Sequence, residues 1–534
     1  MAELHRPWRA LALSLLCVLF IIAPHLKGSL ILEDPFHEGE FFATAVSYFG
    51  TTAPPFRALS IHGVVDVLPA WLARLIWGDD HYLLPTVALY AVLNILAAAL
   101  LLLIADELSR QRPWRGTLLL ATALAAGFFV GYRDLILLAA LYVFVLLHER
   151  PWRVPAATIL RLLLGALLGF GLFWSFDRGI AGAFAFGPPL LILAIKRRSK
   201  WWVALGAALT LLGLGMVSGP FSLPGYLDNL RVLLATSAQW GYGWRGEALI
   251  LSLFAAAIGL FVMALGLRSA WRERRSLERL TLRCVLLLLT VIMLKIGLNR
   301  ADVEHIYSAL WAPLCLLLSL PRKDLQLGRA VLLLPILIGV SAALTVLQHN
   351  LGFFLITCLT AYACTPHQDA RDLRLSHLTL LALLTLSASA LLYSHGKHLR
   401  EGQYQWLARL NTPPSNSATL TPGAGWAAAR LQERQVGCVF DLANNGVINA
   451  LLDRPACTRF TYPVYANADY EAELIQALNT TAPSAIVYST TFPSYRIDGR
   501  DMRQRFPTLD AFVLERYAQQ VCGLGYCVRY RQVE

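Results

Sequence analysis

The residues with the clearest chemical potential lie together near the start of the chain, in the run EDPFHEGE of residues 33–40. This run holds four carboxylates and one histidine: Glu33, Asp34, His37, Glu38 and Glu40. It directly follows an apolar run that is long enough to cross a bilayer. Charged groups at such a place are costly to hold and are candidates for a functional site. A carboxylate there can take a proton from a nucleophile, so the run predicts a catalytic cluster at a membrane surface.

The composition is that of an integral membrane protein. Of the 534 residues, 57% are hydrophobic and only 15% are charged, whereas a soluble domain carries about 25% charged residues. The net charge of +12 could suggest a nucleic-acid partner. However, the Lys and Arg residues lie in short loops between apolar runs, and they form no stripe with interleaved aromatic residues. We therefore expect no nucleic acid among the partners.

Hydropathy predicts a mainly α, polytopic bundle of about thirteen transmembrane spans. They lie near residues 10–32, 82–104, 117–131, 135–148, 154–174, 180–195, 201–218, 248–267, 284–298, 306–320, 329–348, 351–364 and 378–393. The first run has no small-residue cleavage site, so it is interpreted as a retained helix rather than a signal peptide. Most Lys and Arg residues fall on one side, which predicts a cytoplasmic N-terminus and a C-terminus on the outer face of the membrane.

Residues 394–534 differ from the transmembrane domain of residues 1–393. They are polar, with short apolar runs at 437–440 and 484–488, a helical stretch at 470–478 and a linker at 411–417. This pattern predicts a small extracytoplasmic α/β domain. It holds four cysteines, for which disulfides between neighbours in sequence and free buried thiols are both open readings; the candidate pairs are Cys438 with Cys457 and Cys522 with Cys527.

Three short outer turns place arginine beside aspartate. An arginine there can bind a phosphate through two hydrogen bonds while the carboxylate orients it, or the two can form an ion pair that caps a helix end. The residues concerned are Arg133 and Asp134, Asp177 and Arg178, and Arg300, Asp302 and His305.

The first outer loop, residues 33–81, is predicted to contain two amphipathic helices near residues 38–49 and 64–77. The second stretch is interrupted by Pro69. Such helices lie in the plane of the membrane interface. The loop 219–247 adds Trp and Tyr residues, which either belong to the interfacial aromatic belt or stack on sugar rings.

An acidic pair after the first span, a long first loop with interfacial helices, many spans and an outer C-terminal domain resemble the GT-C superfamily. These are integral membrane glycosyltransferases that use polyprenyl-phosphate-linked sugars, such as protein mannosyltransferases and aminoarabinose transferases. The specific motif is Glu33-Asp34, extended to Glu40. The resemblance implies transfer of a hexose or pentose to a glycan, lipid or protein acceptor at the cell envelope, with membrane lipid as a further partner.

The resemblance also implies roles for residues. Asp34 matches the carboxylate that activates the acceptor, although Pro35 after it departs from the family pattern. Glu38 or Glu40 would bind the acceptor or a metal ion, and the cofactor is left open, a divalent cation being one option. Candidates for the lipid phosphate are Arg133, Arg178, Arg300 and His305; His37 and His62 could bind phosphate or a divalent ion, or be ordinary surface residues.

Other functions compete with this interpretation. A transporter or flippase of a lipid-linked or anionic substrate would place charges inside the bilayer, and Lys295 is the clearest such charge. A surface-polysaccharide polymerase or ligase and a non-catalytic membrane partner are further alternatives. In the C-terminal domain, five polar residues either contact an acceptor glycan or form turns: Asp441, Asn444, Asn445, Asp453 and Arg454.

Overall fold

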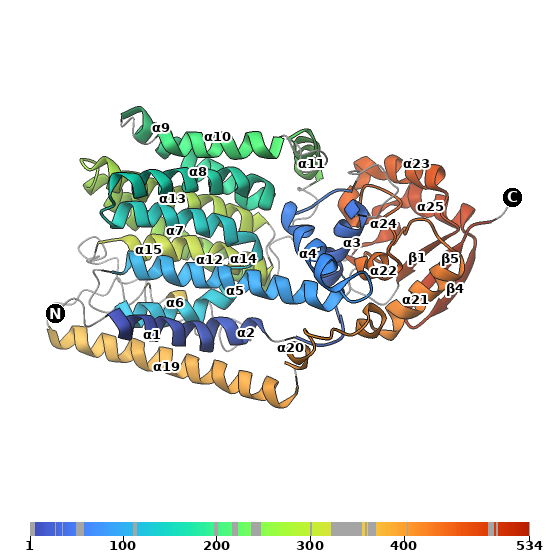
Figure 1. Ribbon diagram of the computed structural model, residues 1–534, viewed down its shortest axis with the longest axis horizontal. Coiled ribbons are helices and arrows are strands. Elements are labelled where there is room, and N and C mark those ends of the chain that lie inside the picture. The colour runs from blue at the N-terminus through green and yellow to red at the C-terminus, as the bar shows by residue number, and fades with distance from the viewer. Residues whose placement is uncertain are drawn as a thin grey trace. The chain divides into compact units, whose positions relative to one another are not determined.

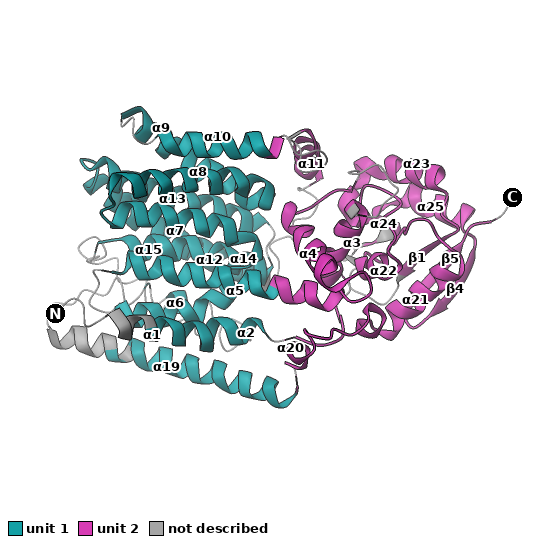
Figure 2. Ribbon diagram, in the orientation of Figure 1, with its two compact units in different colours: residues 1–27, 91–213, 241–401 teal, residues 28–90, 214–240, 402–534 magenta. Residues whose placement is uncertain are grey.

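The computed structural model describes residues 6–26, 28–34, 36–49, 58–110, 115–196, 201–215, 223–236, 247–299, 302–321, 355–357, 360, 370–402, 404–489, 496–497 and 500–532. The chain divides into two compact units (Figure 2). Unit 1 comprises residues 1–27, 91–213 and 241–401, and unit 2 comprises residues 28–90, 214–240 and 402–534. The first outer loop therefore belongs to the same compact unit as residues 402–534, which we call the C-terminal segment. The boundary predicted after residue 393 stays a prediction.

Unit 1 is helical throughout its described part (Figure 1). Its elements are α1 (Arg6–Leu16), a π-helix (Cys17–Ile22), α2 (Ala23–His25), α5 (Leu83–Leu108, which begins in unit 2), α6 (Arg115–Phe129), a 3-10 turn (Tyr132–Asp134), α7 (Leu135–Glu149), α8 (Val154–Trp174), α9 (Phe176–Lys196), α10 (Trp201–Gly215), α12 (Glu247–Arg272), α13 (Leu277–Asn299), α14 (Val303–Ala309), α15 (Trp311–Ser319) and α19 (Ala370–Arg400).

Five of the described helices are long and apolar enough to cross a membrane: α5, α8, α9, α12 and α13. A sixth span results if α6 and α7 are counted as one. The chain is thus an integral membrane protein, but the number of thirteen spans is not confirmed. The runs predicted at 329–348 and 351–364 lie almost entirely outside the described residues, and the run at 201–218 forms a helix of only 15 residues.

The predicted spans at 117–131 and 135–148 form a pair of helices bent by 108°. The break has a local cause. Gly131 is extended, and its N–H donates to Asp134 Oδ2 at 3.0 Å, which caps the new helix at this point. A hydropathy window counts apolar residues and does not register such a cap, so the sequence did not reveal whether this pair spans the membrane once.

Unit 1 has one continuous apolar core between its helices. Trp311 and Phe144 are completely buried in it, with Leu141 and Ile258. Two carboxylates near the end of α5 are also buried, and each is paired: Asp106 with the guanidinium of Arg115, and Glu107 with that of Arg150. Pairing is what makes buried charges tolerable in a low-dielectric interior.

In unit 2, the first outer loop forms α3 (His37–Phe49), a 3-10 turn (Val64–Asp66) and α4 (Leu68–Trp77), as predicted. Pro69 does not interrupt the second helix. It occupies the first turn of α4, where a missing N–H costs nothing and the fixed φ favours helix.

The rest of unit 2 comprises α11 and the C-terminal segment. Its elements are α11 (Leu223–Thr236), α20 (Gln405–Ala408), α21 (Pro422–Glu433), α22 (Gly446–Leu452), α23 (Glu471–Thr481), α24 (Met502–Arg505), α25 (Pro507–Arg516), 3-10 turns (Asn416–Thr419, Pro463–Ala466 and Ala468–Tyr470) and strands β1 (Ala485–Ser489), β2 (Arg496–Ile497), β3 (Arg500–Asp501), β4 (Gln519–Gly523) and β5 (Tyr526–Tyr530).

The C-terminal segment is a small α/β arrangement, as predicted. Its main sheet is antiparallel with strand order β1-β5-β4, and α23 covers the predicted helical stretch. The apolar run at 437–440 forms no strand. It contributes only a single parallel bridge, from Val439 to Ala456, and Asp441 next to it bridges to Val487.

The first loop and the C-terminal segment share one core. Leu32, Phe42 and Val46 pack with Ala424 and Val447 in a single buried cluster. Hydrogen bonds along the chain reinforce this contact.

The linker residue Asn416 is tied into the first loop: its backbone N–H donates to Asp80 O at 2.7 Å and its side-chain amide to Asp79 O at 2.8 Å. The guanidinium of Arg74 donates two bonds to the carboxylate of Asp453, at 2.9 and 3.0 Å. The predicted linker is thus pinned to the loop rather than standing apart from it.

Two disulfides join the four cysteines of the C-terminal segment. Cys438 is bonded to Cys457, and Cys522 to Cys527. The first bond closes the stretch of chain that contains α22. The second joins facing residues of β4 and β5.

Removing the first disulfide should destabilise unit 2 more than removing the second. Their sequence separations of 19 and 5 residues correspond to about 3 and about 2 kcal/mol of restrained chain entropy. The unfolding free energies of Cys438→Ser/Cys457→Ser and Cys522→Ser/Cys527→Ser in detergent would measure this. An equal or larger loss for the hairpin pair would contradict it.

Candidate functional site

Asp34 caps the helix that follows it. Its Oδ1 accepts the N–H groups of Phe36 at 3.2 Å and His37 at 3.1 Å, and its Oδ2 lies 2.7 Å from Nδ1 of His37. A carboxylate at this position satisfies N–H groups that the helix leaves unpaired. The Asp34 side chain remains 53% exposed, so it is accessible to a substrate.

The surroundings keep Asp34 ionised. Partial burial acts to raise its pKa, but the hydrogen bonds and the charge of His37, with the backbone N–H of Phe36, bring the pKa below its ordinary value. Such hydrogen bonds favour the charged form.

Glu38 lies one helical turn further and differs in its pKa. Its Oε2 accepts the N–H of Asp34 at 2.9 Å. Burial raises the pKa of Glu38 to about 7, and the negative charges of Asp34 and Glu33 act in the same direction. Two neighbouring carboxylates therefore hold their protons differently near neutral pH, which is the arrangement that separates acid from base in many active sites.

Glu40 and the turn before α3 are held by the C-terminal segment. The Tyr465 hydroxyl donates to Glu40 Oε1, and the Tyr462 hydroxyl donates to the carbonyl of Phe36 at 2.8 Å. Nothing in the sequence pointed to these tyrosines, because each lies more than 400 residues from its partner.

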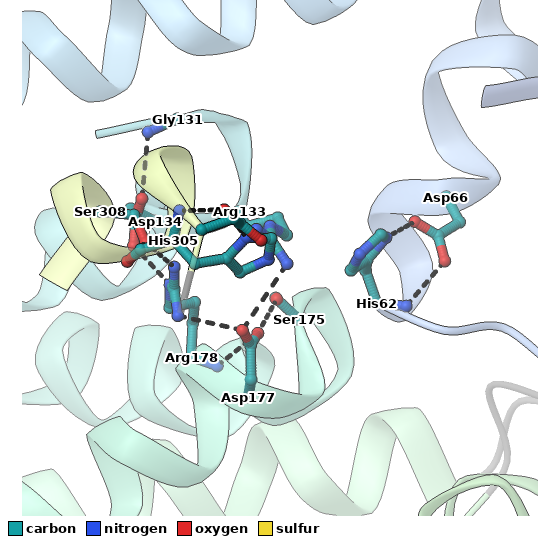
Figure 3. A network of polar contacts seen from close by, with 11 residues as sticks. His62, Asp66, Gly131, Arg133, Asp134, Ser175, Asp177, Arg178, His305 and Ser308 are labelled. Carbon is teal, nitrogen blue, oxygen red and sulfur yellow. Dashed lines mark hydrogen bonds and ion pairs between the residues drawn. The ribbon is translucent and has the colours of Figure 1, made fainter. Parts of the chain in front are cut away.

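His62 is oriented by a buried aspartate that sequence reasoning missed. Asp66 Oδ1 lies 2.8 Å from His62 Nδ1, and Asp66 Oδ2 accepts the N–H of His62 (Figure 3). The same Oδ2 also accepts from the Ser60 hydroxyl and from the N–H of Ile61. The aspartate thus orients the imidazole ring of His62. The spacing of four residues between His62 and Asp66 was a signal available in the sequence.

Arg178 lies at the centre of a polar network in unit 1 (Figure 3). Its Nε donates to Asp134 Oδ1 at 2.6 Å, and both side chains are 2% exposed. Its two Nη atoms donate to Asp177 at 3.0 Å and to Ser308 at 3.2 Å. Because these donors point at protein acceptors, the geometry favours the ion-pair reading for Arg178 and Asp134.

Arg133 differs from Arg178 in being partly exposed. Its Nη1 lies 3.8 Å from Asp177 Oδ2, a long ion pair. Both arginines line a small cavity whose other walls are apolar, including Leu137, Leu168 and Trp174. The cavity has room for about one water molecule, so it does not itself accommodate a lipid headgroup.

Asp302 and His305 repeat the pairing seen twice in unit 2. Asp302 caps α14 by accepting the N–H of His305 at 2.9 Å, and the same oxygen lies 2.7 Å from His305 Nδ1. Arg300 lies outside the described residues.

The polar residues of the C-terminal segment form turns. Asp441, Asn444 and Asn445 are buried, and the Asp441 carboxylate accepts the N–H groups of Ala443 and Asn445. Asp453 pairs with Arg74. The buried residues are therefore turn formers in the structure and not a surface for a glycan.

No group of three or more His, Cys, Asp or Glu side chains that could hold a metal ion is found in the described part of the chain. Of the residues for which a metal ion was considered, His37 is paired with Asp34 and Glu40 is hydrogen-bonded to Tyr465.

The fold is similar to that of a solved oligosaccharyltransferase, in agreement with the resemblance found in the sequence. Archaeal oligosaccharyltransferase AglB from Archaeoglobus fulgidus, solved with an inhibitory peptide and a dolichol phosphate, superposes with a TM-score of 0.51 at 13% identity, over 99% of this chain and 75% of that one. ArnT from Cupriavidus metallidurans, solved with undecaprenyl phosphate, gives a TM-score of 0.45 at 13% identity over 98% of each chain. No protein-family profile and no curated protein sequence matches the chain.

Asp134→Asn should destabilise the protein strongly, because it removes the buried carboxylate from Arg178 and leaves only the partly exposed Asp177 as its ionic partner. Breaking such a pair costs about 3–5 kcal/mol. Asp177→Asn is the comparison variant: Asp177 is bonded to the same guanidinium but is 32% exposed, so its loss should cost less than that of Asp134. Thermal unfolding in detergent measures both, and similar losses for the two variants would contradict the ion-pair reading.

Glu38 should make stability depend on pH. Its pKa is raised from 4.5 to about 7 in the folded protein, so its contribution to stability is fully present below pH 4.5 and is lost as the pH rises through 7. Glu38→Gln cannot ionise. The melting temperature of this variant relative to wild type should therefore rise between pH 5 and pH 8. A difference that is constant over this range would show that Glu38 has an ordinary pKa.

Proposed function

We propose that this chain is a membrane glycosyltransferase. It transfers a sugar from a polyprenyl-phosphate-linked donor to a glycan, lipid or protein acceptor on the outer face of the inner membrane. The observation that carries this proposal is the pair of carboxylates at the start of α3. The pKa of Asp34 lies below its ordinary value, and the pKa of Glu38 is raised to about 7. The GT-C fold supports the choice of donor.

Asp34 is the proposed base. The acceptor nucleophile attacks the anomeric carbon of the donor, the bond between that carbon and the phosphate oxygen breaks, and the lipid phosphate leaves with the bonding electrons. The proton of the nucleophile passes to Asp34. His37, which is bonded to Asp34 Oδ2, stabilises the carboxylate before transfer and keeps it oriented.

Glu38 is proposed to bind the acceptor. In its ionised form it accepts a hydrogen bond from an acceptor hydroxyl, and its pKa near 7 lets it exchange protons at working pH. Glu40 is bonded to Tyr465 and is assigned to holding α3.

The departing lipid phosphate needs positive charge. Within unit 2 we assign this role to His62, whereas Arg133 and His305 of unit 1 stay candidates from the sequence. Arg133 is partly exposed and lines an apolar cavity. Nδ1 of His62 is paired with Asp66, and Nδ1 of His305 is paired with Asp302. Arg300 stays a candidate from the sequence.

The proposed orientation puts the N-terminus in the cytoplasm and unit 2 outside. Two disulfides support an oxidising compartment for the C-terminal segment. The transporter alternative is less well supported. Lys295, the charge that it would place on a substrate path, lies on the exposed side of α13.

Asp34→Asn should abolish transfer, with a loss of at least about 100-fold, because general-base catalysis contributes on the order of 10²–10⁴. The assay uses the full chain in lipid nanodiscs, a panel of radiolabelled polyprenyl-phosphate sugars and membrane extract as acceptor. Asp80→Asn, which alters an exposed carboxylate of the same loop, is the control and should keep full activity.

Other outcomes would redirect the proposal. Equal transfer by wild type and Asp34→Asn would reassign the base to Glu38. No transfer from any donor, with labelled lipid crossing the bilayer of proteoliposomes, would replace the enzyme by a flippase.

A further inference from the structure

The hydroxyl of Tyr462 links two segments of unit 2 that are far apart in sequence. It donates to the carbonyl of Phe36 at 2.8 Å and accepts the N–H of Gly446, the first residue of α22, at 3.2 Å. The side chain is only 1% exposed. A hydroxyl that is buried and satisfied on both sides fixes the segments it joins.

The rings continue this contact. Phe36 stacks on Tyr462 with 5.1 Å between centroids, and Tyr462 stacks on Tyr465 with 5.9 Å. Tyr465 then bonds Glu40 through its hydroxyl. The turn that carries Asp34 is thus held before α3 at Phe36, and the first turn of α3 is held at Glu40.

Helix α3 is in direct backbone contact with the C-terminal segment. A methyl group on Gly39 would lie 2.7 Å from the backbone nitrogen of Gly446, and one on Gly446 would meet the backbone of Gly39. Contacts under 3 Å are not tolerated, so neither position admits a larger residue without separating α3 from α22. Gly39 lies between Glu38 and Glu40, so this contact is at the acidic cluster.

Three of the hydrogen bonds that orient Asp34 depend on the turn before α3. They come from the N–H of Phe36, the N–H of His37 and the ring of His37. If Phe36 shifts, the donors move away from the carboxylate.

We infer that Tyr462 and Tyr465 are positioning residues: the C-terminal segment holds Asp34 and Glu40 in place through Phe36 and α3. The C-terminal segment therefore acts as the support of the acidic cluster. The effect on rate rests on the proposed function, whereas the effect on the local geometry does not.

The test is Tyr462→Phe in the full chain, which keeps the ring stack and removes the hydroxyl. Hydrogen–deuterium exchange of the amides of residues 34–40 should become at least tenfold faster. The kcat for sugar transfer should fall at least tenfold while the KM for the lipid-linked donor changes less than twofold. Tyr517→Phe is the matched control, since Tyr517 is also 1% exposed and belongs to the same segment; it should change neither quantity.

Tyr465→Phe is the second variant, for the case that Tyr462→Phe does not fold. It should speed exchange around Glu40 and lower kcat less than Tyr462→Phe. Unchanged exchange in both variants overturns the inference, as does faster exchange with full kcat. If wild type transfers no sugar at all, the proposed function fails, and the exchange experiment still decides whether the tyrosines hold the turn.

Discussion

The close approach of two glycines, Gly39 and Gly446, is the contact on which the rest of unit 2 depends. It sets the distance between α3 and α22 at the level of the backbone. Phe42 and Val46 on α3 and Val447 on α22 then share one core, and the tyrosine hydroxyls reach the turn before α3. Packing and polar contacts here reinforce one another, because each requires the same separation of the two helices.

A second constraint is the cost of holding charge at the edge of an apolar bundle. In both units such charges are paired: an aspartate lies within ion-pair distance of Nδ1 of a histidine or of an arginine guanidinium. Where the pair is buried, as for Arg178 and Asp134, the charges stabilise the structure and are withheld from substrate. Where the pair is exposed, as for Asp34 and His37, the carboxylate stays ionised and accessible. Exposure thus distinguishes these two pairs, which residue type alone does not.

Sequence reasoning predicted the features that depend on local patterns. The helices α3 and α4 follow from the spacing of apolar residues, and the two disulfide pairs join the cysteines that were nearest in sequence. The count of thirteen spans is not confirmed, and one reason is that Gly131 and Asp134 bend two apolar runs through a cap that hydropathy does not register. The role of Tyr462 was invisible because its partner lies 426 residues away. The same holds for Gly39 and Gly446, which have no side chain to give a periodic signal.

The long sequence separation between α3 and the tyrosines that hold it has a consequence for synthesis. Glu40 and Tyr465 are 425 residues apart, and at about 5–20 residues per second the ribosome needs roughly 20 to 85 s to travel from one to the other. Until the C-terminal segment has been synthesised, the first loop therefore lacks the contact between Gly39 and Gly446. A chain whose translation stops before Tyr462 would contain every acidic residue of the cluster but would lack the tyrosines that hold it in place. Assembly of the acidic cluster thus depends on synthesis of the C-terminal segment at least as far as Tyr465.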